Sequence, residues 1–318
     1  METILHRKVD LNGISMHVAE KGEGGPIVLL LHGFPELWYS WRHQILGLAA
    51  RGYHAVAPDL RGFGDTDIPP SPSSYTMLHL VGDILALINA LGQDKVFVVG
   101  HDWGAVVAWH LCMLRPDKVK ALVNLSVAFT PRNPARSPIT SLHSRFGDDH
   151  YMVKFQKPGA AEAEFAKIGS ASILKKFLTT REPNAYIVPK ETGFAAPSEE
   201  EITLPPWLSE EDIDYYAAKF EKTGFTGGLN YYRCMDLNWE LTAAWTGAQI
   251  KVPTKFIVGD LDLTYHSPGV QDYIHKGGFK KDVPFLEDVV VMEGVGHFIT
   301  LEKAHEITHH VYEFIKNF

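Results

Sequence analysis

The sequence predicts an α/β protein, in which a mostly parallel central sheet is flanked by helices and interrupted by a helical insertion. Two observations predict this class. Strand-like apolar runs alternate with helical patterns near both ends of the chain, which is typical of a parallel sheet whose strands are joined by crossover helices. This alternation stops after residue 130 and returns at residue 253, so the middle of the chain is expected to form a separate helical region.

The N-terminal part supplies most of the predicted sheet. Its run "PIVLLLHG" at 26–33 is continuously apolar, as expected of a strand buried on both faces. The predicted strands of this part are 3–9, 14–19, 26–33, 53–60, 95–100 and 119–125. The predicted helices between them are 39–50, 76–91 and 104–115.

The middle of the chain has a different pattern. Pro131, Pro134 and Pro138 interrupt it, and residues 140–245 contain short helical patterns and loops with no clear strand. The stretch "SEED" at 209–212 is typical of a capping box, which opens a helix that we expect to end near residue 222.

The α/β alternation then resumes in predicted strands 253–260 and 287–294 and in a predicted final helix at 302–316. We therefore expect an α/β core of residues 1–130 and 246–318, with a helical cap domain of residues 131–245.

Composition and charge narrow the possible partners. The chain has 318 residues and a net charge of −8, which argues against binding to nucleic acid or to an anionic membrane. No apolar run suits a transmembrane helix, and the first residues are too polar for a signal peptide. Cys112 and Cys234 follow no disulfide or metal spacing. We expect a cytoplasmic monomer that acts on a small molecule.

The stretch "VVGHDWGAVVAWH" at 98–110 joins a predicted strand to a predicted helix. Its pattern Gly100-x-Asp102-x-Gly104 is similar to the nucleophile elbow Gly-x-Ser-x-Gly of the α/β-hydrolases, with a carboxylate in place of the serine. On this pentapeptide alone, Asp102 could equally be a helix N-cap.

Two further residues favour catalysis. Asp262 and His297 follow the predicted strands 254–259 and 288–293, as Asp102 follows its own strand. Open α/β sheets place their ligands at the carboxyl ends of their strands. The chain order of nucleophile, acid and histidine is also that of the α/β-hydrolases. The sequence therefore predicts that Asp102, Asp262 and His297 form a catalytic triad.

The stretch "HGFP" at 32–35 follows the first core strand, where the hydrolase fold supplies an oxyanion-hole donor. We assign the two donors to the backbone amides of Phe34 and Trp103. The alternative is a plain Gly-Pro turn, and Pro35 is compatible with a preceding cis peptide bond.

Two stretches of the sequence are similar to metal or cofactor motifs. "HEITH" at 305–309 matches the zinc-protease pattern His-Glu-x-x-His. However, His305 and His309 project from the face opposite the apolar face of the final helix, and no third ligand is evident. The sequence contains no Walker loop, and "GEGG" at 22–25 is not a dinucleotide fingerprint. We therefore expect neither a metal nor a cofactor.

An aspartate nucleophile in place of serine allows the enzyme to attack a different kind of electrophile, a saturated carbon. A serine that attacked an alkyl carbon would leave an ether, whereas an aspartate leaves an ester that His297 and an oxyanion hole can hydrolyse. An aspartate is ionised near neutral pH, so the first step needs no base. Both a halide and the oxygen of a strained epoxide suit this scheme as leaving groups. An epoxide oxygen also needs a hydrogen-bond donor, which a tyrosine can supply.

Five stretches distributed along the chain are informative in combination: "HGFPELWYSWRHQ" (32–44), "GHDWGA" (100–105), "FTGGLNYYR" (225–233), "VPTKFIVGDLD" (252–262) and "GHF" (296–298). On these motifs the sequence resembles the plant soluble epoxide hydrolases over essentially its whole length. The resemblance implies the α/β-hydrolase fold with an inserted cap, or lid, and a small apolar epoxide as substrate. It also implies that Tyr151 and Tyr232 grip the epoxide oxygen and that Glu36 orders the hydrolytic water.

The sequence leaves two alternative functions open. Haloalkane dehalogenases share an aspartate nucleophile followed by tryptophan, but many carry an asparagine where this chain has Phe34. A non-catalytic receptor with the hydrolase fold is disfavoured by the complete triad. The sequence does not distinguish fatty-acid epoxides from aryl epoxides.

Overall fold

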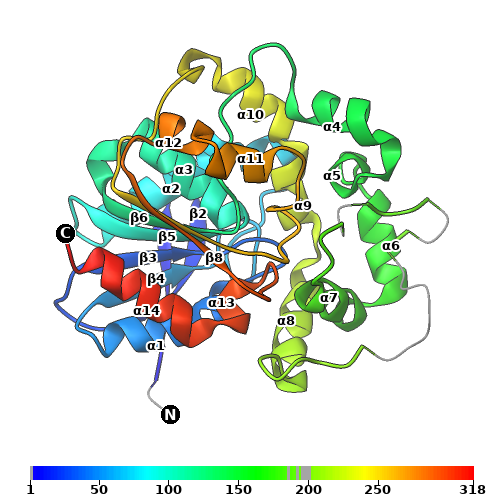
Figure 1. Ribbon diagram of the computed structural model, residues 1–318. Coiled ribbons are helices and arrows are strands. Elements are labelled where there is room, and N and C mark those ends of the chain that lie inside the picture. The colour runs from blue at the N-terminus through cyan, green and yellow to red at the C-terminus, as the bar shows by residue number, and fades with distance from the viewer. Residues whose placement is uncertain (1–2, 185–186, 191–192, 195–201) are drawn as a thin grey trace.

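A central eight-stranded sheet organises the computed structural model, which describes residues 3–184, 187–190, 193–194 and 202–318 (Figure 1). The strands are β1 (Leu5–Leu11), β2 (Ile14–Lys21), β3 (Ile27–Leu31), β4 (His54–Pro58), β5 (Val96–His101), β6 (Val119–Leu125), β7 (Thr254–Gly259) and β8 (Leu286–Met292). They lie in the order β1-β2-β4-β3-β5-β6-β7-β8. Strand β2 pairs antiparallel with β1 and β4, and the other neighbours are parallel. The predicted α/β class with a mostly parallel sheet is therefore confirmed.

Helices cover both faces of this sheet (Figure 1). Helices α1 (Arg42–Ala49) and α14 (Ala304–Ile315) pack on one face, and α2 (Met77–Ala90) and α3 (Trp103–Leu114) pack on the other. Along β3, Leu30 faces α1 and α14, while Leu29 and Leu31 belong to the core beneath α2 and α3. Because every side chain of β3 is buried, this strand is apolar without interruption.

One predicted helix begins differently from the observed one. The predicted helix 39–50 begins with a 3-10 turn, η1 (Trp38–Trp41), and becomes α-helical at Arg42. The predicted final helix 302–316 is confirmed as α14, whose ends lie within two residues of the predicted ones. A short helix, α13 (Ile299–Glu302), precedes α14, and Lys303, with the non-helical backbone angles φ −127° and ψ 41°, separates the two.

A series of helices follows β6 and precedes β7. They are α4 (Pro138–Phe146), η4 (Gly147–Asp149), α5 (Tyr151–Lys154), α6 (Ala160–Ile168), α7 (Ser170–Thr179), α8 (Glu210–Thr223), α9 (Thr226–Arg233), α10 (Met235–Leu241) and η5 (Ala243–Trp245). The remaining short helices are η2 (Pro72–Tyr75), η3 (Pro116–Lys118), α11 (Val270–His275) and α12 (Gly278–Asp282). Figure 1 shows α4 to α8 beside the sheet, away from its two covered faces. The division of the chain at residues 130 and 245 stays a prediction.

The predicted capping box at the start of α8 is present. The Asp212 amide donates to the Ser209 hydroxyl over 3.2 Å, and the Ser209 amide donates to the Asp212 carboxylate over 3.0 Å. These two bonds satisfy backbone donors that the first turn of a helix leaves unpaired. They explain why α8 begins at Glu210.

Helix α8 is joined to the sheet region through η1. The Trp38 indole donates to the Tyr215 hydroxyl over 2.9 Å, and the hydroxyls of Ser40 and Tyr216 lie 2.7 Å apart. These contacts hold the region of α8 against the loop that follows β3. Within the described part of the chain, every helix is too short or too polar to cross a lipid bilayer.

Candidate active site

A sharp turn between β5 and α3 carries Asp102. Its backbone angles are φ 49° and ψ −119°, a conformation that favours glycine and costs a non-glycine residue of order 1–3 kcal/mol. The turn brings α3 close to β3: a Cβ on Gly104 would lie 2.0 Å from the Leu31 carbonyl oxygen. A Cβ on Gly100 would lie 2.7 Å from Cα of Ala105. Both glycines of the elbow pattern are therefore required by close packing.

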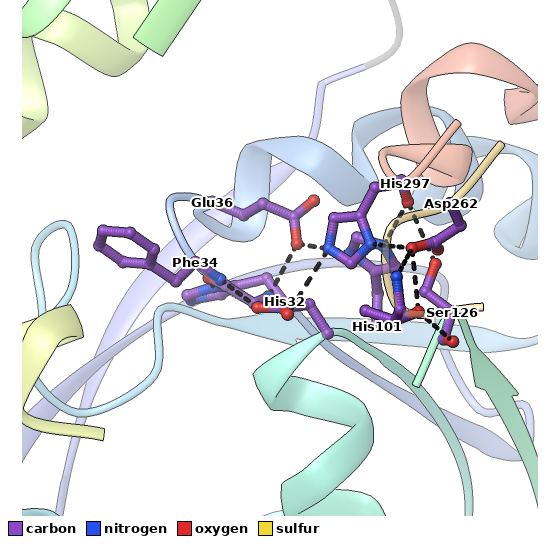
Figure 2. A network of polar contacts seen from close by, with 10 residues as sticks. His32, Phe34, Glu36, His101, Ser126, Asp262 and His297 are labelled. Carbon is purple, nitrogen blue, oxygen red and sulfur yellow. Dashed lines mark hydrogen bonds and ion pairs between the residues drawn. The ribbon is translucent and has the colours of Figure 1, made fainter. Parts of the chain in front are cut away.

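The structure brings the three predicted triad residues together. The His297 Nδ1 atom lies 2.9 Å from Asp262 Oδ1, and its Nε2 atom lies 3.5 Å from Asp102 Oδ2. Figure 2 shows the His297–Asp262 contact. Asp262 is fully buried, and its Oδ1 atom also accepts from the amide and the hydroxyl of Thr264. Asp262 thus fixes the imidazole so that its other nitrogen faces Asp102.

Two carboxylates control the protonation of His297. Burial lowers the pKa of this imidazole, but the Asp262 charge and the hydrogen bonds to Asp102 and Asp262 raise it well above its ordinary value. Burial likewise raises the pKa of Asp262, but the charge and the hydrogen bond of His297 outweigh burial and hold that pKa below its usual range. The two carboxylates thus favour the protonated form of His297, and loss of either negative charge would weaken that preference.

A second buried pair, His101 and Glu36, lies beside the triad (Figure 2). His101 Nδ1 is 2.7 Å from Glu36 Oε2, and His101 Nε2 is 2.8 Å from the His297 carbonyl oxygen. Each ring nitrogen of His101 therefore has an oxygen partner. The Ser126 hydroxyl also donates to the His297 carbonyl, over 3.1 Å. The backbone at His297 is therefore held from two directions.

Glu36 is deeply buried and ionised. Burial raises its pKa, but the charge and the hydrogen bond of His101, with further help from His32 and the Gly33 amide, lower the pKa to about 2. Its Oε2 atom accepts from the Gly33 amide over 2.8 Å. Its Oε1 atom has no hydrogen-bond partner among the described residues. An ionised, unpaired oxygen in this position could hold a water molecule.

The backbone amide of Phe34, the first predicted oxyanion donor, points at Asp102. The Phe34 amide donates to Asp102 Oδ1 over 2.8 Å. The loop can approach so closely because residue 33 is glycine: a Cβ there would lie 2.4 Å from the Asp102 Cβ. The Phe34–Pro35 peptide bond is cis, as the sequence allows. The second predicted donor, the amide of Trp103, stands at the first residue of α3 and stays a prediction.

Tyr151 and Tyr232 come from α5 and α9 and meet edge to face. Their ring centroids lie 5.8 Å apart, and the Tyr232 ring also packs 4.9 Å from Trp103 and 5.7 Å from Phe34. Burial raises the pKa of both phenols, and the Asp102 charge raises both further. Both phenols therefore stay protonated and neutral, and each can donate a hydrogen bond close to the Asp102 carboxylate.

Two groups of residues have the composition of a metal site. His305 and His309 are exposed, while Ile307 of the same helix is buried, which agrees with the expected orientation of α14. Among the described residues, His17, Asp59 and Asp65 lie close enough together to share an ion. Their atoms are already engaged, because His17 is paired with Asp59 over 2.8 Å and Asp65 with Lys219 over 2.5 Å. This second group is explained as an ion-pair network.

Comparison with known proteins agrees with this geometry. The alpha/beta hydrolase fold family matches residues 26–177, so the fold and the elbow define an α/β-hydrolase. Epoxide hydrolase 1 of Siraitia grosvenorii is 65% identical over 318 residues, which is 100% of both chains. Epoxide hydrolase A of Mycobacterium tuberculosis is 39% identical and covers 97% of this chain and 96% of its own.

Solved structures give the same result. Potato epoxide hydrolase I from Solanum tuberosum is 60% identical, with a TM-score of 0.95 over 99% of this chain and 100% of its own. An epoxide hydrolase from Vigna radiata is 61% identical, with a TM-score of 0.94 over 99% of each chain. The chain belongs to the family of plant epoxide hydrolases.

Proposed function

We propose that this protein hydrolyses epoxides to vicinal diols through a covalent ester on Asp102. The observation that carries this proposal is the juxtaposition around one carboxylate. Asp102 lies at a strained elbow, and its carboxylate faces the imidazole of His297, which is paired with the buried Asp262. The charge of Asp102 also acts on the neutral phenols of Tyr151 and Tyr232. The epoxide hydrolase names of its full-length relatives support the same activity.

In the first step, Asp102 attacks an epoxide carbon. Its Oδ1 atom is held by the Phe34 amide, whereas Oδ2 faces His297, so Oδ2 is the atom that forms the bond to carbon. The carbon–oxygen bond of the epoxide breaks as the new bond forms, and the departing oxygen takes a proton from Tyr151 or Tyr232. The site then holds an ester whose carbonyl oxygen, Oδ1, already lies at the Phe34 amide.

Formation of the ester prepares the second step. It removes the negative charge of Asp102, which is one cause of the raised pKa of His297. The pKa of His297 therefore falls, and its proton returns to the phenolate that the first step left on Tyr151 or Tyr232. The neutral imidazole can then accept a proton from water as that water attacks the ester carbon.

The tetrahedral intermediate collapses with loss of the diol oxygen, which takes the proton from His297. Asp102 is left as a carboxylic acid and passes its proton to His297, which restores the starting state. The oxyanion is stabilised at the amides assigned to Phe34 and Trp103. The unpartnered Oε1 atom of Glu36 supports a role for this residue in holding the attacking water. Asp262 acts through His297, as the residue that orients the imidazole and stabilises its charged form.

The surroundings of the phenols favour an apolar substrate. Aromatic side chains surround Tyr232, including Phe34, Trp103 and Phe155, whose ring centroid is 5.0 Å away. We propose a small apolar epoxide as the substrate. The proposed catalytic groups all come from one chain, which supports a monomer as the active unit. Cys112 and Cys234 form no disulfide with each other, which supports the cytoplasm as the compartment.

The proposed function is tested by trapping the ester. The His297→Gln variant keeps the nucleophile but lacks the base, so intact-protein mass spectrometry should show protein plus one substrate mass after exposure to a styrene-type or fatty-acid epoxide. The Asp102→Asn variant is the matched control and should form no adduct unless its amide hydrolyses back to aspartate. Absence of an adduct in His297→Gln, despite measurable epoxide binding, would contradict the two-step scheme.

Assays on the unmodified protein separate the alternative functions. An epoxide hydrolase releases diol, a dehalogenase releases halide from a haloalkane, and a receptor binds without turnover. Halide release without diol formation, or binding without any product, would overturn the proposal.

A further inference from the structure

An arginine just after α7 reaches the loop that carries His297. The guanidinium of Arg181 donates to the carbonyl oxygen of Gly294 and lies 3.1 Å from Glu302 Oε1. The other carboxylate oxygen of Glu302 accepts from the amide of Gly296 over 2.9 Å. Gly296 directly precedes His297, so Arg181 is connected to the backbone of the proposed base through a single side chain.

The chain around Arg181 also packs on this loop. A Cβ on Gly296 would lie 3.2 Å from Cγ of Arg181 and 3.5 Å from the carbonyl oxygen of Thr180. The loop is thus covered by a segment from the predicted cap. On its other side, the His297 carbonyl is fixed by His101 over 2.8 Å.

The exposure of the two charged groups shows which one depends on the other. The Glu302 side chain is only 6% exposed, whereas that of Arg181 is 41% exposed. A nearly buried carboxylate needs a charged or hydrogen-bonding partner, because an unpaired buried charge is costly. Without Arg181, the Glu302 carboxylate would keep only the hydrogen bond from the Gly296 amide. The carboxylate would then tend to move toward water and to draw the loop of Gly296 and His297 with it.

We propose that Arg181 and Glu302 are positioning residues for His297, which connect the α7 segment to the loop of the catalytic base. This inference rests on the proposed function, in which His297 acts in ester hydrolysis. Asp102 is positioned independently by the Phe34 amide and the elbow. The contact should therefore influence the hydrolysis of the ester and leave its formation largely unchanged.

Single-turnover kinetics test this separation. Arg181→Ala should slow ester hydrolysis about tenfold, less than the ~10²-fold loss that follows a misplacement of about 1 Å. Ester formation, followed by tryptophan fluorescence and rapid-quench mass spectrometry, should stay within about twofold of the unmodified protein, as this positioning argument requires. Arg181→Lys keeps the charge and should recover part of the loss.

Lys175→Ala is the matched control. Lys175 lies in α7 and forms an ion pair with Glu210 over 2.8 Å, so the variant removes a cap cation without altering the loop at His297. If Arg181→Ala does not fold, Glu302→Gln takes its place, because glutamine still offers an acceptor to the Gly296 amide while the ion pair is lost. Equal slowing of both steps, or kinetics like those of Lys175→Ala, would overturn the inference.

The outcome also distinguishes this inference from the proposed function. If His297→Gln forms no ester, the proposed function fails. If His297→Gln traps the ester but the ester of Arg181→Ala decays at the unmodified rate, the proposed function stands and the positioning role of Arg181 is wrong.

Discussion

Removal of the hydroxyl groups of Tyr151 and Tyr232 should strongly reduce the rate of epoxide opening. The variants Tyr151→Phe, Tyr232→Phe and their combination delete only the hydroxyls and keep the rings, which lie 5.8 Å apart. A hydrogen bond to a charged group contributes about 1.5–3 kcal/mol. Since about 1.4 kcal/mol corresponds to a factor of ten in rate, each single variant should slow ester formation ~10- to 10²-fold.

The double variant should lose more than either single variant. The two rings are in contact, and Tyr232 is buried while Tyr151 is partly buried, so water compensates poorly for the loss of both hydroxyls. General acid assistance as a whole is worth about 10²- to 10⁴-fold, and this range bounds the expected effect of the double change. Ester hydrolysis, once the ester has formed, should be affected much less because it depends on His297.

The assay is the rate of ester formation with excess enzyme, with Tyr231→Phe as the control. Tyr231 is the sequence neighbour of Tyr232, but its hydroxyl donates to the Arg61 carbonyl over 2.9 Å and serves packing. Its loss should lower the free energy of unfolding by about 1–3 kcal/mol with little effect on ester formation. A folded double variant that still opens epoxides at nearly the unmodified rate would refute the assignment of the two phenols.

Other predictions follow from the charges and the helix cap. Asp102→Asn removes one of the negative charges that raise the pKa of His297, so the pKa of this imidazole should fall. NMR of the imidazole measures this pKa, and an unchanged value would contradict the coupling between the two residues. Because ester formation removes the same charge, the pH profile of ester hydrolysis should rise through a pKa below that of the resting imidazole. Ser209→Ala removes half of the capping box of α8 and should lower the free energy of unfolding by about 1 kcal/mol, measured by denaturant titration; no change would mean that this cap is dispensable.

The parts of the site that could be predicted depend on local patterns. The glycines around Asp102 follow from the close packing of a helix on a strand, which needs the same spacing in any chain with this turn. Asp262 and His297 could be placed because residues at the carboxyl ends of neighbouring parallel strands meet at one edge of the sheet. Here β7 and β8 are indeed adjacent.

The parts that the sequence analysis missed depend on contacts between distant segments. His101 stands next to Asp102, but its partners are Glu36 and the His297 carbonyl, 65 and 196 residues away. Its position inside the elbow was the available signal, although nothing in the spacing indicated those partners.

The origin of the diol oxygen tests the central claim most directly. If Asp102 attacks carbon, one of its own oxygens enters the diol, because water then cleaves the ester at its carbonyl. A single turnover in ¹⁸O-water with enzyme in excess should therefore give unlabelled diol, and the label should appear in Asp102 within the peptide that contains "GHDWGA". If the first diol instead carries the label and Asp102 stays light, His297 activates water directly against the epoxide, and the covalent role of Asp102 is wrong.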